Sequence, residues 1–202
     1  MKASSPELNK ALRATFWRSF AQNSSWEYTR QLGVGFGFSM IPTLRVIYKD
    51  DKEGLSEAMD RQMQMIGITN VLSPLLMGIA TALEEENKRN PEFDANIINN
   101  IKVSLMGPIS AIGDSLLLVT WRIICMGISL DLCLKGNFLG PLIFFVSYNI
   151  PTVAARWFSL KVGYEQGTNF IEKMSESNLI QSITEKAGIL GMIVVGAMVP
   201  SF

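Results

Sequence analysis

The sequence predicts an all-α, multi-pass membrane protein with broken or re-entrant helices and an amphipathic N-terminal region. Two stretches, 62–83 with 22 residues and 136–155 with 20, contain no charged side chain. Each is long enough to cross a bilayer, because roughly 20 apolar residues span the hydrocarbon core as a helix. In a third apolar stretch, 103–121, Asp114 is the single charged residue. The alternative is a large soluble helical protein whose helices are fully buried.

The composition excludes several functional classes. The 202 residues have a mean hydropathy of +0.23, and 18 basic side chains balance 18 acidic ones. A net charge of zero gives no electrostatic support for a nucleic-acid partner. Histidine is absent, which removes histidine–metal sites, Ser–His or Cys–His catalysis and phosphohistidine on this chain. We therefore expect no histidine-dependent metal site or catalytic site.

Residues 1–31 are expected to form an amphipathic region outside the hydrocarbon. Leu8, Leu12, Phe16 and Phe20 recur every four residues, with basic residues between them. This pattern is typical of a helix that lies on the membrane plane or docks on a partner. The positive-inside rule favours a cytoplasmic N-terminus, and the basic residues on which this rests are Lys2, Lys10, Arg13 and Arg18.

The first uncharged stretch, 62–83, is read as a membrane helix. Pro74 in its middle predicts a kink. Asn70 needs a polar partner at that depth and is a candidate for lining a path. The stretch is followed by three acids that we expect in a loop, where they either face a partner protein or are simply solvated: Glu84, Glu85 and Glu86.

The segment around Asp114 is the most informative part of the chain. A charged side chain in a bilayer costs several kcal/mol, so it usually faces a water-filled path or a partner. Gly107, Pro108 and Gly113 precede the acid and disfavour a continuous helix, which predicts a re-entrant turn. A broken apolar segment that carries one acid is typical of a transport site near the middle of the membrane.

The second uncharged stretch, 136–155, is read as another membrane helix. It is followed by Arg156 and Trp157, which we interpret as an anchor at the membrane interface. A further apolar stretch, 187–202, is shorter than a complete crossing.

An ordered set of short motifs runs along nearly the whole chain. Each motif is weak alone, but together they resemble the IID membrane component of the mannose-type sugar phosphotransferase system (PTS). The motifs are FWRSF at 16–20, FSMIP at 38–42, TALEEE at 81–86, VSLMGP at 103–108, GDS at 113–115, LGPL at 139–142, RW at 156–157, GY at 163–164, GT at 167–168 and ILG at 189–191.

The resemblance implies a non-catalytic transport subunit in the bacterial cytoplasmic membrane, with no catalytic residue, no cofactor and no metal site. Members of the family pair with a IIC subunit and form with it the path for a hexose-type sugar. The phosphoryl group travels over histidines of separate IIA and IIB components, which agrees with the absence of histidine here. The resemblance thus implies a hetero-oligomer. It also implies that the chain, read as one domain over 1–202, is shortened at its C-terminal end, because members continue beyond the ILG run.

The sequence departs from the family pattern at two places. The residues after GDS read LLLVTWRI instead of an aromatic residue with Leu-Arg-Pro, and the expected His-Pro is missing near Asn70. These departures leave the identity of the sugar open.

The resemblance gives Asp114 two alternative roles. It accepts hydrogen bonds from sugar hydroxyls, or it pins a re-entrant turn through backbone N–H groups. Ser115 and Thr120 add hydroxyl contacts to the path or form hydrogen bonds between helices.

Two other functions compete with a sugar path. A purely structural scaffold subunit would leave all sugar contacts to IIC. An intramembrane aspartyl protease would use a GxGD motif, but Ala111 stands at the position of the first glycine. Such a protease also needs a second membrane aspartate, since one carboxyl group acts as base and the other as acid.

Overall fold

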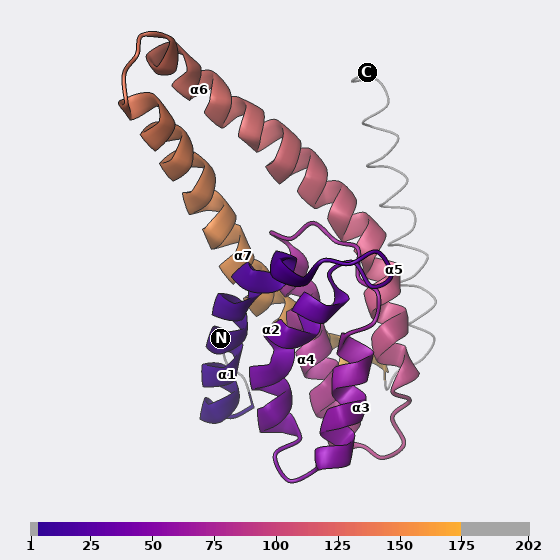
Figure 1. The fold of residues 1–202 in the computed structure, drawn as a ribbon. Coiled ribbons are helices and arrows are strands. Elements are labelled where there is room, and N and C mark those ends of the chain that lie inside the picture. Colours follow the sequence, from indigo (N-terminus) through magenta and orange to yellow (C-terminus); the bar gives the residue numbers. More distant parts are fainter. Residues whose placement is uncertain (1–3, 175–202) are drawn as a thin grey trace.

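The computed structural model describes residues 4–174, and all the regular elements in this range are helices. The prediction of an all-α fold is therefore confirmed for that part. Figure 1 shows a bundle from which a long helical hairpin projects. The elements are α1 (Pro6–Arg18), η1 (Ser19–Ser25), α2 (Gly33–Ile47), α3 (Lys52–Gln62), α4 (Ser73–Arg89), α5 (Asn96–Gly113), η2 (Asp114–Trp121), α6 (Arg122–Leu134) and α7 (Leu139–Met174).

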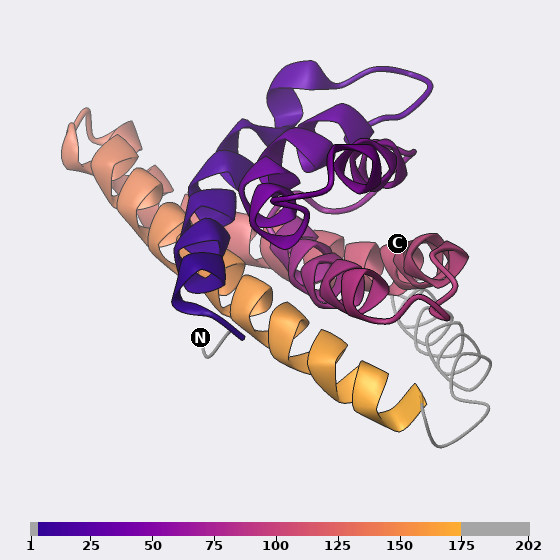
Figure 2. The ribbon, with the colours of Figure 1, turned by 90° about the horizontal axis from the view of Figure 1, so that it is seen from below.

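Helix α1 is amphipathic, as its spacing predicts, but the protein covers its apolar face itself. Ser5 caps the helix by accepting a hydrogen bond from the Leu8 N–H. Leu8, Leu12 and Phe16 are buried in the main core, and α1 packs on α2 and α7 (Figure 2). In the described structure Leu8 and Leu12 are therefore not free for a membrane surface or a partner, whereas Phe20 at the end of the pattern is exposed.

Helix α4 lies at the centre of the bundle and packs along the second half of α7. Two glycines permit this close approach. A Cβ atom on Gly78 would lie 2.4 Å from the Leu160 carbonyl oxygen, and one on Gly163 would lie 2.1 Å from the Leu75 carbonyl oxygen. Nearly every residue in the first three turns of α4 is buried.

The stretch 62–83 is not one membrane helix. It comprises the end of α3 at Gln62, an irregular segment over 63–72, and the first part of α4. Pro74 sits in the first turn of α4, where a proline has no helical hydrogen bond to break. It therefore starts a helix and does not kink one. The stretch is uncharged because most of it lies in the protein core.

The predicted re-entrant turn is also wrong. Helices α5, η2 and α6 form one continuous helix over 39 residues, Asn96–Leu134. Gly107, Pro108 and Gly113 all lie within its helical course. A proline removes one backbone hydrogen bond, and the neighbouring turns carry the helix past it. The irregularity is a π-helical segment, η2, that starts at Asp114.

The outer parts of the long helix and of α7 form the two arms of the hairpin. They are joined by a turn in which Gly136 adopts φ +67°, a conformation that glycine adopts without strain. Many large apolar side chains on these arms are exposed: Leu116, Val119, Ile123, Met126, Leu130, Leu134, Phe138, Leu142, Phe145, Ile150 and Val153.

Among the described residues, one helix, Asn96–Leu134, is long and apolar enough to cross a membrane. The stretch 136–155 forms the turn and the first part of α7. The predictions that concern Lys2 and the stretch 187–202 lie outside the described residues.

Candidate functional site

Two irregular segments meet beside the long helix. The Leu32 N–H donates to the Ile66 carbonyl at 3.1 Å, and the Ile66 N–H donates to the Arg30 carbonyl at 3.2 Å. Between them, Gln31 adopts φ 49°, a left-handed conformation that costs a residue other than glycine free energy. Such strain is retained where the surroundings hold it, and it clusters at binding sites.

Thr69 links the irregular segment 63–72 to the long helix. Its N–H donates to Ser110 Oγ at 3.0 Å, and its hydroxyl donates to Asp114 Oδ1 at 2.6 Å. The approach is close because Gly113 has no side chain, and a Cβ atom there would lie 2.7 Å from Thr69 Cβ. Asp114 thus ties the start of the π-helical segment to the bundle.

A cleft of about 510 Å³ opens at this junction. It has the size of a small-molecule site. Asn70 Oδ1 is buried and accepts no hydrogen bond in the part of the chain that the structure describes. The Asp114 side chain is exposed. The lining residues are Asn23, Trp26, Gln31, Leu32, Gly67, Ile68, Thr69, Asn70, Ser110, Asp114 and Leu118.

The structure therefore brings Asn70 and Asp114, two of the residues singled out in the sequence, into one cleft. A buried amide oxygen without a partner is costly, because burial removes its hydrogen bonds to water. Asn70 lines the cleft, but this oxygen is itself covered, so a ligand could donate a hydrogen bond to it only after the side chain rotates. An exposed carboxylate beside it can accept further hydrogen bonds.

Ser115 and Thr120 do not line this cleft. Their hydroxyls bond to carbonyls of their own helix: Ser115 Oγ donates to Ile112 O at 3.2 Å, and Thr120 Oγ1 donates to Ser115 O at 2.8 Å. Both hydroxyls therefore satisfy the backbone around the π-helical segment in this structure.

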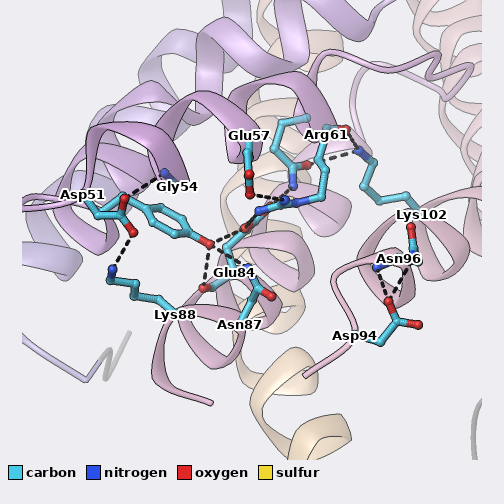
Figure 3. A network of polar contacts seen from close by, with 12 residues as sticks. Asp51, Gly54, Glu57, Arg61, Glu84, Asn87, Lys88, Asp94, Asn96 and Lys102 are labelled. Carbon is cyan, nitrogen blue, oxygen red and sulfur yellow. Dashed lines mark hydrogen bonds and ion pairs between the residues drawn. The ribbon is translucent and has the colours of Figure 1, made fainter. Parts of the chain in front are cut away.

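The three acids predicted in a loop belong instead to helix α4. Glu84 is fully buried, and Figure 3 shows it surrounded by hydrogen-bond donors. Arg61 Nη2 donates at 2.9 Å, Gln62 Nε2 at 2.7 Å and the Tyr48 hydroxyl at 2.8 Å. Lys102, also buried, donates to Arg61 O at 2.7 Å and to Gln62 Oε1 at 3.2 Å. We call these five residues the buried cluster.

The neighbouring acids also pair within the chain. Glu85 accepts a hydrogen bond at 2.8 Å from the hydroxyl of Tyr164 on α7, and Glu86 pairs with Arg89. The prediction of a partner-facing loop is therefore wrong. Composition cannot show that an acidic run continues a helix whose partners come from distant segments.

The electrostatics of the buried cluster favour charged Arg61 and neutral Tyr48. Burial alone would lower the pKa of Arg61, but hydrogen bonding and the charge of Glu84 outweigh it, so the pKa is raised. Burial raises the pKa of Tyr48, and the charge of Glu84 raises it further. The cluster is thus satisfied internally.

Arg156 is not an anchor at an interface. It is buried, and its Nη1 donates to Ser19 O at 2.7 Å and to Ser19 Oγ at 3.0 Å. The guanidinium lies 4.6 Å from the centre of the Phe20 ring, a favourable cation–π distance. Arg156 on α7 therefore binds the C-terminal end of α1 through these hydrogen bonds.

The sequence analysis missed several residues of the cleft. Gln31, Thr69 and Ser110 are ordinary polar residues in sequence. The one available signal was the pair Thr69 and Asn70 inside an uncharged stretch, since isolated polar residues in such a stretch need partners. Among the side chains described over residues 4–167, no group of three His, Cys, Asp or Glu residues is placed to bind a metal ion.

The described part is a helical protein that combines an apolar hairpin with a polar cleft at its base. Comparison with known families identifies the family to which this helical protein belongs. Residues 8–202 match the family model of the PTS system mannose/fructose/sorbose family IID component, and the chain belongs to this family. The resemblance carried by the sequence motifs is thereby confirmed.

Individual relatives agree with this assignment. The chain is 34% identical over 188 residues to the mannose-specific EIID component of Escherichia coli K12, covering 93% of this chain and 66% of that protein. It is 35% identical over 188 residues to the sorbose-specific EIID component of Klebsiella pneumoniae, covering 93% and 68%. It is 32% identical over 190 residues to the fructose permease IID component of Bacillus subtilis, covering 94% and 68%. The chain therefore spans about two thirds of the length of these relatives.

The fold is similar to that of a chain in the cryo-EM structure of the mannose transporter ManYZ in complex with microcin E492. The TM-score is 0.88 at 32% identity, and the match covers 100% of this chain and 72% of that one. A second similar structure is described as a membrane protein, with a TM-score of 0.75 at 32% identity, covering 96% of this chain and 71% of that one.

Proposed function

We propose that the protein is a membrane subunit of a mannose-type PTS permease. With a IIC subunit it forms the path of a hexose-type sugar, which separate IIA and IIB components phosphorylate. The names of the relatives, which are mannose-, sorbose- and fructose-specific, support this proposal. The observation on which it depends is the polar cleft that contains the unpartnered Asn70 oxygen and Asp114.

The chemistry of the cleft suits a sugar. Vicinal hydroxyls donate hydrogen bonds, and both Asn70 Oδ1 and the Asp114 carboxylate accept them. Trp26 adds an exposed aromatic surface to the same cleft.

The hairpin is the part that we assign to the bacterial cytoplasmic membrane. Segments η2 and α6 contain 8 and 13 residues, and together they extend for ~30 Å, the thickness of the hydrocarbon core. Asp114 then lies at one end of the arm. The basic residues of α1 support a cytoplasmic position for the bundle, by the positive-inside rule.

The test uses Asp114→Asn, Asp114→Ala and Asn70→Ala in a full-length IIC–IID complex. Uptake of labelled mannose, fructose and sorbose is measured, and assembly is measured by co-purification of IIC. The matched control is Asp131→Asn, because Asp131 lies on the same long helix but is exposed near the tip of the hairpin. We expect at least tenfold lower uptake for the cleft variants with normal assembly, and normal uptake for the control.

The second candidate is a scaffold subunit that does not contact sugar. It is favoured by the hydrogen bond from Thr69 to Asp114, which pins the long helix to the bundle. Failed assembly of the Asp114 variants would support the scaffold, and normal uptake with normal assembly would refute the sugar path. The cleft does not support a protease, because such an enzyme needs two carboxyl groups and Asp114 is the sole carboxylate that lines the cleft in the described structure.

A further inference from the structure

A second hollow lies on the opposite flank of the hairpin base, between α1 and α7. The two helices run antiparallel: the Ser4 N–H donates to the Tyr164 hydroxyl at 3.3 Å, and Arg156 binds Ser19. The ring centres of Phe16 and Trp157 are 4.9 Å apart. The groove measures about 710 Å³, and most of its lining is apolar: Phe16, Trp17, Ile150, Val153, Trp157 and Phe158.

The groove has a basic end. Arg13 and Trp157 line both this groove and a neighbouring hollow of about 560 Å³, which Lys10 also lines. Lys10 and Arg13 are exposed, lie one helical turn apart, and form no ion pair with the side chains described over residues 4–167. Glu7, the acid of α1, lines neither hollow. The apolar groove therefore ends at two exposed cations.

We propose that this groove binds an anionic phospholipid, with its acyl chains along α7 and its phosphate between Lys10 and Arg13. The charge of the phosphate complements the two cations, and the apolar lining complements the chains. Trp17 and Trp157 lie between these ends, at the level where tryptophan prefers the membrane interface. A free phosphate ion would occupy only the basic end.

The lipid site depends on the proposed membrane location. The experiment must therefore distinguish a failure of lipid binding from a failure of the membrane location. The purified complex of the full-length chain with IIC is titrated in a neutral detergent with phosphatidylglycerol, phosphatidylcholine or inorganic phosphate. The midpoint of thermal unfolding and the lipids retained in native mass spectra are measured. A chain that stays dissolved and monomeric without detergent would refute the membrane location, independently of any lipid preference.

Two kinds of variant probe the groove. Lys10→Ala/Arg13→Ala removes the charges, and the matched control Arg45→Ala/Lys49→Ala removes two exposed cations at the end of α2. Ala154→Phe fills the apolar part, since Ala154 lines it. We expect phosphatidylglycerol alone to stabilise the unmodified complex. Its apparent affinity should fall about thirtyfold in Lys10→Ala/Arg13→Ala, from the strength of each cation at an anionic surface.

Ala154→Phe should lose retained phosphatidylglycerol with the charges intact, whereas the control should bind as the unmodified complex does. Equal binding of both phospholipids, equal stabilisation by inorganic phosphate, or equal losses in the two double variants would overturn the proposal. Separation of the subunits by Ala154→Phe would also overturn it, because the groove would then be a protein interface.

Discussion

The long helix contributes to two polar regions, the buried cluster and the cleft. The two regions differ in how far their polar groups are hydrogen-bonded. Lys102, in the buried cluster, and Asp114, at the cleft, are ~18 Å apart along the axis. In the buried cluster, Glu84 is bonded to Arg61, Gln62 and Tyr48. At the cleft, by contrast, Asp114 is exposed and Asn70 Oδ1 has no partner in the described structure.

This difference indicates that the buried cluster stabilises the fold, whereas the cleft is available to bind a ligand. Charges removed from water must be paired and hydrogen-bonded, so a satisfied cluster holds α3, α4 and the long helix in one arrangement. A polar group left unpaired lowers stability and keeps hydrogen-bonding capacity for a ligand. Substitutions in the buried cluster should therefore change stability first, and substitutions at the cleft should change uptake first.

The largest effect is expected from Glu84→Ala. It leaves the partly buried Arg61 and the fully buried Lys102 without their counter-charge, which should cost ~3–5 kcal/mol of unfolding free energy. The measurement is the denaturation midpoint of the purified complex in detergent. The control is Glu86→Ala, whose partner Arg89 is exposed, and which should cost less than ~1 kcal/mol. Equal losses would mean that the buried cluster does not hold the bundle together.

Gly113→Ala should have the next largest effect. The new methyl group would overlap Thr69, and relieving this overlap costs ~2 kcal/mol. It should also move Asp114 away from Asn70, so uptake should fall with stability. Gly127→Ala is the control on the same long helix, since no atom lies within 4 Å of the added Cβ. It should be neutral or stabilising by up to ~1 kcal/mol.

Thermal melting and uptake of the two alanine variants, measured together, check this prediction. A normal melting temperature and normal uptake in Gly113→Ala would show that the junction between the irregular segment and the helix tolerates displacement.

The sequence predicted the helical class from the length of its uncharged stretches, but it did not predict the hairpin. It also singled out Asn70 and Asp114, which the fold brings into one cleft, although their role in binding sugar stays a prediction. It could not separate α4 from a membrane helix. A helix buried on all sides is as apolar as one in lipid, and hydropathy does not report what surrounds it.

The errors at Pro108 and Glu84 have a different cause. The low helix propensity of Gly107 and Pro108 predicts that the helix ends there. The proline removes one backbone hydrogen bond, however, and the hydrogen bonds of the turns on either side are enough to continue the helix. Glu84 was read from its acidic neighbours, whereas its partner Arg61 lies in another helix, far away in sequence. Long-range pairing of this kind is set by the fold and leaves no local pattern.

A smaller effect is expected from pH at Tyr48. Burial and the charge of Glu84 raise its pKa above the usual value of about 10. The folded state then holds the proton more tightly, so this stabilisation is complete below about pH 10 and is lost as the pH rises above it. Tyr48→Phe should flatten that loss relative to the unmodified protein, and should cost about 1.5 kcal/mol at neutral pH because Glu84 loses a donor.

Melting temperatures of both proteins between pH 7 and pH 11 check this, with Tyr28→Phe as the control. Tyr28 is 91% exposed, so its removal should leave the alkaline slope unchanged. Identical slopes for Tyr48→Phe and the unmodified protein would contradict the raised pKa.

The smallest effect is expected from Lys135→Ala at the tip of the hairpin. Lys135 pairs with Asp131 at 2.6 Å, and their side chains are 67% and 70% exposed. The distance is shorter than that between Arg61 and Glu84, yet solvent screens the pair, so its loss should cost less than ~0.5 kcal/mol. Lys135→Ala and Glu84→Ala, melted side by side, therefore test whether burial, and not bond length, decides what an ion pair contributes. A large loss at the tip would mean that the Lys135–Asp131 pair is desolvated in the complex.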